Sequence, residues 1–244
     1  MTGIPVTGRA LPPTSAFAGD DGRADPTLTA ALAGLADGTR GLVDVVSALV
    51  GARVLVPVLA HTEEAADGEC THAGDSHASA GIAAILTPDG RTGLPVFSSI
   101  GTMAEWRSDA RPVPAETARA ALSAVEEGWE VLVLDPAGPV PTLIPRPAVR
   151  ALAQQREWIP AVVDGVVDPR VRQAVAGALE TIGEIVAAQV TAGGRAEVAI
   201  ILTIRAGLRQ AELDLVLERV GAALAAQDVV SERVDSLELR VRSA

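Results

Sequence analysis

Apolar residues recur along this chain at two spacings, one typical of helices that bury a single face and one typical of short strands. Helical spacing predicts helices at about 26–35, 39–49, 115–127, 146–155, 169–189 and 209–226. Apolar runs predict strands at about 54–59, 82–86, 94–98, 129–134, 140–144, 197–204 and 237–241. The sequence TPDG at 87–90 suits a tight turn, so 82–86 and 94–98 are expected to form a hairpin.

The segment after this hairpin carries distinctive start signals. Thr102 and Glu105 match a capping box, which predicts a short helix carrying Trp106. Pro112 and Pro114 predict an extended connection, with Pro114 at the point where the next helix begins. The residues that this next helix is expected to bury are Ala118, Ala121, Leu122 and Val125.

The pattern predicts an α+β protein with two domains. Residues 1–24 are rich in Gly, Pro, Ser and Thr and show little periodicity, which predicts a disordered tail. Residues 25–160 are expected to form an N-terminal mixed α/β domain with short strands and capped helices. Residues 165–244 are expected to form a smaller, layered α-β-α-β domain.

Composition and charge narrow the class of protein. The 244 residues carry a formal net charge of −11, and all 20 basic residues are arginine. An acidic chain disfavours nucleic acid and anionic membranes as partners, because binding to either requires a positively charged surface. The single cysteine, Cys70, excludes an internal disulfide and suits a reducing compartment. We expect neither a signal peptide nor a membrane span, so the sequence predicts a cytoplasmic protein.

Several short motifs occur in a fixed order between residues 53 and 139. They are RVLVPV at 53–58, LPVFS at 94–98, Trp106, ARPVP at 110–114 and LDPAGP at 134–139. This combination resembles the SseB family over roughly 26–160, and the remainder is more loosely similar to that family's C-terminal domain. The resemblance implies a cytoplasmic bacterial protein with an α+β N-terminal domain and no established enzymatic activity. It supplies no catalytic residues.

The polar segment 61–80 contains every histidine and the cysteine of the chain. These residues are His61, Cys70, His72 and His77. Imidazole and thiolate are ligand types that zinc prefers, so one interpretation is a metal site. The other is a solvated loop between two strands, because the spacings match no standard zinc pattern.

Four further residues are candidates for an interaction surface. Asp135 follows a buried strand, a position where sites form in α/β domains, but its side chain can also satisfy amides of the turn at 136–138. Trp106, Arg107 and Arg111 place an indole and two guanidinium groups near a proline-stiffened segment. Trp and Arg are enriched in binding hot spots, although a tryptophan on a short amphipathic helix also suits the core.

No catalytic constellation is recognisable. The chain has no Gly-x-Ser-x-Gly elbow, and the absence of lysine excludes a P-loop and Schiff-base chemistry. Adjacent carboxylates at 20–21, 63–64 and 126–127 are explained by solvation.

We therefore predict a non-catalytic protein-interaction or regulatory module, with an unidentified protein partner and no cofactor. The alternatives are a metal-binding or metal-sensing protein that uses the 61–77 loop, and small-molecule binding at the inter-domain cleft. The strand edges of the C-terminal unit allow a homodimer, unless the preceding helix covers them.

Overall fold

The computed structural model describes residues 17–61 and 79–244. The helices of the N-terminal body are α1 (Pro26–Asp37), α2 (Leu42–Gly51), α3 (Ile100–Trp106), α4 (Thr117–Glu126) and α5 (Arg146–Ala153). Its strands are β1 (Arg53–His61), β2 (Ser79–Ile82), β3 (Ile85–Leu86), β4 (Thr92–Val96), β5 (Arg111–Glu116), β6 (Val131–Leu134) and β7 (Thr142–Ile144).

These strands form a three-stranded sheet and a four-stranded sheet, which one bridge joins. β1 pairs antiparallel with β5 on one side and with β2 on the other. β4 lies antiparallel to β3 and parallel to β6, and β7 pairs antiparallel with β6. Leu55 and Phe97 exchange backbone hydrogen bonds of 2.8 and 2.9 Å, which join the two groups of strands.

Helices cover both faces of the joined sheets. α1, α2, α4 and α5 bury one face together with Val54 and Val56 of β1. Leu55 points to the opposite face, because side chains alternate along a strand. There it packs with Phe97, with Met103 of α3 and with the partly buried Trp106.

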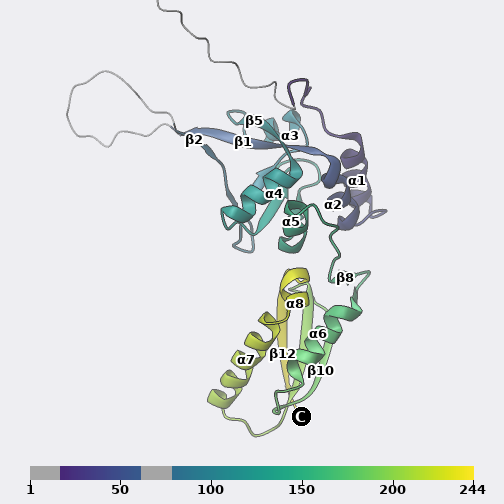
Figure 1. The fold of residues 1–244 in the computed structure, drawn as a ribbon, viewed down its shortest axis with the longest axis vertical. Coiled ribbons are helices and arrows are strands. Elements are labelled where there is room, and N and C mark those ends of the chain that lie inside the picture. Colours follow the sequence, from purple (N-terminus) through teal and green to yellow (C-terminus); the bar gives the residue numbers. More distant parts are fainter. Residues whose placement is uncertain (1–16, 62–78) are drawn as a thin grey trace, which may run out of the picture.

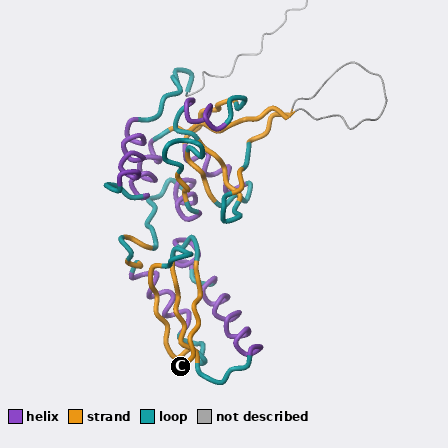
Figure 2. The backbone as a smooth tube through the Cα atoms, turned by 180° about the vertical axis from the view of Figure 1, so that it is seen from behind, coloured by secondary structure: helices purple, strands orange, loops and turns teal. Residues whose placement is uncertain are grey.

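The C-terminal body is a three-stranded sheet covered by helices on one face. Its helices are α6 (Pro169–Leu179), α7 (Gln210–Ala225) and α8 (Asp228–Arg233), and its strands are β10 (Ile185–Ala192), β11 (Val198–Ile204) and β12 (Leu237–Ser243). β11 is central, antiparallel to β10 and parallel to β12. Figure 2 shows these strands from the face on which the described part of the chain places no helix.

The two bodies stand end to end along the long axis of the molecule (Figure 1). The segment after α5 and the short hairpin of β8 (Val162–Val163) and β9 (Val166–Val167) connect them. α8 and the start of β12 lie at the end of the C-terminal body that faces the N-terminal one. None of the described helices is both long and apolar enough to cross a membrane.

The α+β class is confirmed, and the local start signals explain several elements. Asp25 caps α1 by accepting hydrogen bonds from the amides of Thr27 and Leu28, at 2.7 and 3.1 Å, and Pro26 opens the helix as expected. The predicted hairpin is present as β3 and β4.

Three predicted boundaries are wrong. The helix predicted at 169–189 ends at Leu179, and residues 185–192 form the strand β10. The C-terminal body therefore contains one strand that the predicted α-β-α-β order lacks. The short helix α3 begins after Ser99, whose hydroxyl accepts from the amide of Thr102, instead of after Thr102 itself. Pro114 lies within β5 and does not open α4.

One prediction about packing is also wrong. α4 buries Thr117, Ala120, Ala121 and Ala124. Leu122 and Val125, which were expected inside, are 46% and 40% exposed. Most of the predicted tail, residues 1–16, lies outside the described residues. At its end, Asp20 pairs with Arg53 and the carbonyl of Gly22 accepts a 2.9 Å hydrogen bond from the amide of Ile100.

Candidate functional site

An open groove of about 570 Å³ lies between α4 and the end of the sheet formed by β1, β2 and β5. Val58, Ile82 and Val113 line it from the helix-covered face of the strands, and Trp129 lines it from the segment after α4. Ile82 is 48% exposed and Val113 is 45% exposed. Apolar side chains of three strands are therefore left open to solvent where α4 does not cover them.

The charges at this groove are mostly negative. Glu116, Glu126 and Glu127 line it, with Arg119 as the one basic residue among its lining residues. In residues 17–61 and 79–244, none of these four side chains forms a salt bridge. The groove thus combines an apolar floor with uncompensated carboxylates.

The prolines of β5 determine how a ligand can use this groove. Leu55 and Pro57 of β1 stand opposite Pro114 and Pro112. The backbone N–H and C=O of Leu55 bond to Phe97, on the side away from β5, so Leu55 and Pro114 form a non-hydrogen-bonded pair, as do Pro57 and Pro112. The backbone groups of Pro112 and Pro114 therefore point away from β1, toward the outer edge of β5. Proline has no amide hydrogen, so this edge offers no donor at either position. Contacts in the groove must come from side chains instead of from an added strand.

Asp135 lies at the carboxyl edge of the parallel strands β4 and β6 and is 3% exposed. Its carboxylate accepts three hydrogen bonds, from the Ser98 amide at 2.9 Å, the Ser98 hydroxyl at 2.6 Å and the Thr102 hydroxyl at 2.7 Å. The predicted capping of the turn at 136–138 by this carboxylate is wrong, because the Asp135 carbonyl accepts the Gly138 amide. The carboxylate ties the start of α3 to the end of β6.

The other predicted interaction residues do not form one surface. Trp106 is partly buried and packs against Phe97, with ring centroids 5.3 Å apart. Arg107 pairs with the exposed Asp109 at 2.7 Å. Arg111 lies opposite Val58 and is therefore on the other face of the sheet, beside the groove.

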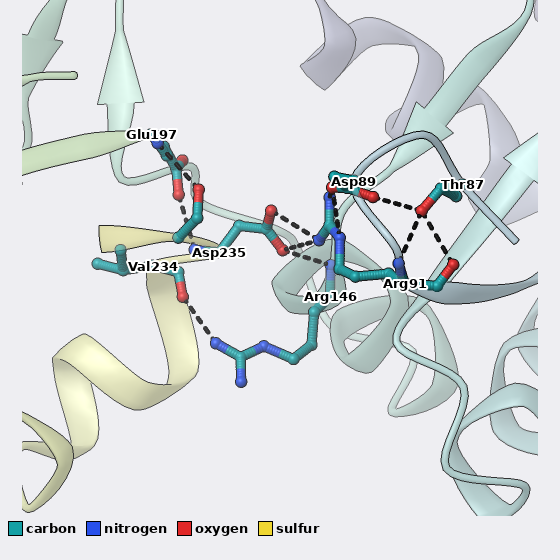
Figure 3. A network of polar contacts seen from close by, with 8 residues as sticks. Thr87, Asp89, Arg91, Arg146, Glu197, Val234 and Asp235 are labelled. Atoms are coloured by element: carbon teal, nitrogen blue, oxygen red, sulfur yellow. Dashed lines mark hydrogen bonds and ion pairs between the residues drawn. The ribbon is translucent and has the colours of Figure 1, made fainter. Parts of the chain in front are cut away.

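A polar network joins the two bodies (Figure 3). Nη1 of Arg91 donates to both carboxylate oxygens of Asp235, at 3.0 and 2.9 Å. Asp235 also accepts the amide of Arg146 at 3.0 Å, at the start of α5. The Arg146 guanidinium reaches the Val234 carbonyl at 3.0 Å, and the Asp235 amide donates to Glu197 at 2.7 Å.

Hydrogen bonds, burial and charges in this network shift three pKa values. The Thr87 hydroxyl and the Arg91 guanidinium lower the pKa of Asp89 to about 2. Burial alone would lower the pKa of the Arg91 guanidinium, but Asp89 and Asp235 together raise this pKa above its usual value. Burial, with the negative charge of Asp235, raises the pKa of Glu197.

Beside this network lies a junction pocket of about 370 Å³, lined by residues of both bodies. Trp158, Glu197 and Asp235 contribute the polar groups that line it, together with Asp164. Trp158 is 9% exposed, and its indole nitrogen has no hydrogen-bond partner. A buried donor without an acceptor is uncommon in folded proteins.

The predicted metal site falls mostly outside the described residues. Cys70, His72 and His77 lie in 62–78, and His61 is the last residue of β1. Within the described ranges, His, Cys, Asp and Glu form no group of three or more that could hold a metal ion. A metal site in the 61–77 loop stays a prediction.

Sequence reasoning missed the groove. A helical wheel of α4 does not reveal that its alanine side packs against the sheet while Leu122 and Val125 face outward. The available signal was the exclusively non-polar run at 112–115, which includes Val113 between two prolines.

Comparison with known proteins agrees with the motifs of the N-terminal body. The family model described as the SseB protein N-terminal domain matches residues 28–151, which is just over half of the chain. No curated protein and no solved structure matched the chain. The match ends within α5, so the likeness of the C-terminal body to a second SseB domain stays a prediction. The chain belongs to the SseB family.

Proposed function

We propose that this SseB-family chain is a non-catalytic interaction module that binds a segment of another protein in the groove beside α4. The observation that carries the proposal is the exposure of Ile82 and Val113 beside Trp129, on the sheet face that helices cover elsewhere. Clustered apolar side chains that are left in solvent mark interaction sites in soluble proteins. Tryptophan is also among the residues most enriched in binding hot spots.

The charges at the groove define the chemistry of the partner. Among the described residues, three carboxylates and the Arg119 guanidinium line the groove, Arg111 lies beside it, and the whole chain is acidic. A segment with apolar side chains flanked by Lys or Arg would pack its apolar side chains against the groove floor and pair its basic side chains with the carboxylates that line the groove. The prolines of β5 exclude pairing at that edge, so the partner's side chains carry the affinity.

The proposal is tested by panning a phage-displayed peptide library against the full chain. We expect enriched peptides to combine apolar residues with Lys or Arg. Enrichment should disappear with Val113→Glu, which places a charge on the floor of the groove. The control Leu122→Glu changes an exposed residue of α4 outside the groove lining and should leave enrichment intact. Enrichment that survives Val113→Glu, or no enrichment at all, would contradict the proposal.

Affinities of the selected peptides can be measured with Trp129 as the sole fluorophore. Trp106→Phe keeps an aromatic ring against Phe97, and Trp158→Phe removes an indole donor that has no acceptor. In this double variant we expect binding to shift the emission of Trp129 to shorter wavelength, because the partner excludes water from the ring.

A second candidate function is supported by the unpaired indole of Trp158 in the junction pocket. A small molecule with a hydrogen-bond acceptor would satisfy this donor. Native mass spectrometry of the untagged protein should then detect an organic adduct that Trp158→Phe loses. The bare mass of the chain under the same conditions would remove this candidate, and a mass increase equal to zinc would support the 61–77 loop instead.

A further inference from the structure

β12 is an edge strand with unused backbone donors and acceptors. In the part of the chain that the structure describes, it pairs with β11 alone. The carbonyl of Ser236 accepts the Val198 amide, and the Ala244 amide donates to Ile204, so the even-numbered residues of β12 bond to β11. The N–H and C=O groups of Leu237, Leu239, Val241 and Ser243 therefore point to the free edge. No proline blocks this edge, in contrast to β5.

The sequence of β12 is complementary to itself in one antiparallel register. Two copies related by a two-fold axis can bond only where outward-facing residues stand opposite each other. With Leu239 on the axis, Leu237 stands opposite Val241 and Glu238 stands opposite Arg240. An axis at Glu238 would oppose two carboxylates, and an axis at Arg240 would oppose two guanidinium groups. Like charges directly opposite destabilise a sheet, so only the Leu239 register suits the full strand.

Glu238 ties β12 to the turn between β10 and β11. Its side chain is 8% exposed. Its Oε1 accepts from the Gly194 amide at 2.9 Å and from Arg240 at 2.8 Å, whereas Oε2 has no hydrogen-bond partner. Nε of Arg195 lies 3.6 Å from Oε2, and the Arg195 side chain is 88% exposed. Both carboxylate oxygens are therefore bonded or covered within the chain, and the Leu239 register rests on the order of residues along β12.

The opposite face of β12 leaves apolar side chains at the edge. Leu237, Leu239 and Val241 are in register with Val198, Ile200 and Leu202, which are buried beneath the helices. The three β12 residues are nevertheless 36%, 37% and 41% exposed. In the Leu239 register each of them would contact its counterpart in a second copy and lose solvent exposure.

We propose that two copies of this chain pair antiparallel through β12, with Leu239 on the two-fold axis. The two sheets then become one six-stranded sheet with all helices on the same side. Reciprocal pairs of Glu238 and Arg240 lie on the other side. This dimer is independent of the groove beside α4.

Sedimentation equilibrium of the full chain tests the association. We expect a mass that approaches twice the 24.9 kDa of one chain as the concentration rises toward about 1 mM. Leu239→Pro removes the N–H that points to the free edge and leaves the hydrogen bonds to β11 in place. The variant should therefore be monomeric, and its far-ultraviolet circular dichroism spectrum should match that of the wild type. The matched control Leu239→Val keeps the N–H and should keep the dimer. A monomer at every concentration, or a dimer that survives Leu239→Pro, would overturn the proposal.

Disulfide trapping tests the register. In a chain with Cys70→Ser, we expect Leu239→Cys to cross-link two copies under mild oxidation, because residues opposite each other in a hydrogen-bonded pair lie about 5.5 Å apart at Cα. Val241→Cys should not cross-link with itself, but should do so with a Leu237→Cys chain. Faster cross-linking of Arg240→Cys than of Leu239→Cys would place the axis elsewhere and overturn the register.

Discussion

Asp135 stands where a catalytic residue is often found, but its carboxylate has a structural role. It stands at the carboxyl edge of parallel strands, where α/β domains often form sites. The structure directs its carboxylate to Ser98 and Thr102, across the gap between β6 and α3. Its φ of 49° is in the left-handed region, which Asp and Asn tolerate better than most residues.

We expect Asp135→Ala to destabilise the chain by about 2–4 kcal/mol, because it leaves buried donors unpaired and places alanine at positive φ. Asp135→Asn should cost less, since asparagine keeps one acceptor and tolerates this φ. Urea unfolding followed by tryptophan fluorescence measures both. Equal losses for the two variants would contradict the roles assigned to the acceptor and to φ.

At the level of elements, β5 and β12 illustrate two ways to treat a sheet edge. β5 places Pro112 and Pro114 at the positions whose backbone faces outward, which prevents another strand from pairing there. β12 has no such protection and carries opposite charges in a self-complementary order. The difference predicts that one edge remains free and that the other is used.

Replacing both prolines of β5 tests this interpretation. The double change Pro112→Ala and Pro114→Ala restores two outward amide donors, so we expect self-association that increases with protein concentration. Static light scattering at matched concentrations measures it. Ala115→Ser, on a residue whose backbone bonds inward to β1, is the control and should scatter like the wild type. Indistinguishable scattering from all three chains would refute the protective role of the prolines.

The elements that the sequence predicted well are those with local signals. Asp25 and Pro26 locate α1, and TPDG at 87–90 locates the hairpin of β3 and β4. β10 was missed because Val186 continues the helical spacing of α6, although the chain turns at 180–184 and this valine is 62% exposed. Periodicity cannot distinguish such a continuation from a new strand when alanine and valine are abundant.

At the scale of the whole molecule, Asp235 joins the two bodies. It pairs with Arg91, which is 144 residues away, so no local pattern predicts the contact. The groove was unpredictable for a similar reason, because it depends on how far α4 extends over strands that are distant in sequence. The sequence determines the elements more directly than their mutual placement.

Asp235→Asn should loosen this junction. The Arg91 and Asp235 side chains are 19% and 12% exposed, and we expect a loss of about 1–3 kcal/mol because the substitution removes a charge-assisted pair. Tryptophan fluorescence reports residues 106, 129 and 158, whereas circular dichroism reports both bodies. The two unfolding transitions should therefore separate in this variant. Asp109→Asn, in the exposed pair with Arg107, is the control and should leave the two unfolding transitions together.

We expect Glu197 to make the stability of the chain depend on pH. Its pKa is raised in the folded chain, chiefly by burial, so its protonated form is favoured there. The stability linked to this group is fully present below its unfolded pKa and is lost as pH rises through the folded pKa. Glu197→Gln mimics the protonated form. It should therefore be more stable than the wild type at pH 7 and similar to it near pH 4. Urea titrations at both pH values check this, and a variant that is less stable at pH 7 would contradict it.

The central claim is that the groove beside α4 binds another protein. The most direct measurement is photo-cross-linking in the native cells, with a benzophenone amino acid in place of Val113 and, as a control, in place of Leu122. We predict a discrete adduct from position 113, with the cross-link mapped by mass spectrometry to an apolar segment flanked by Lys or Arg, and its loss when Val58→Glu is added. No discrete adduct from position 113, or the same adduct from position 122, would contradict the account.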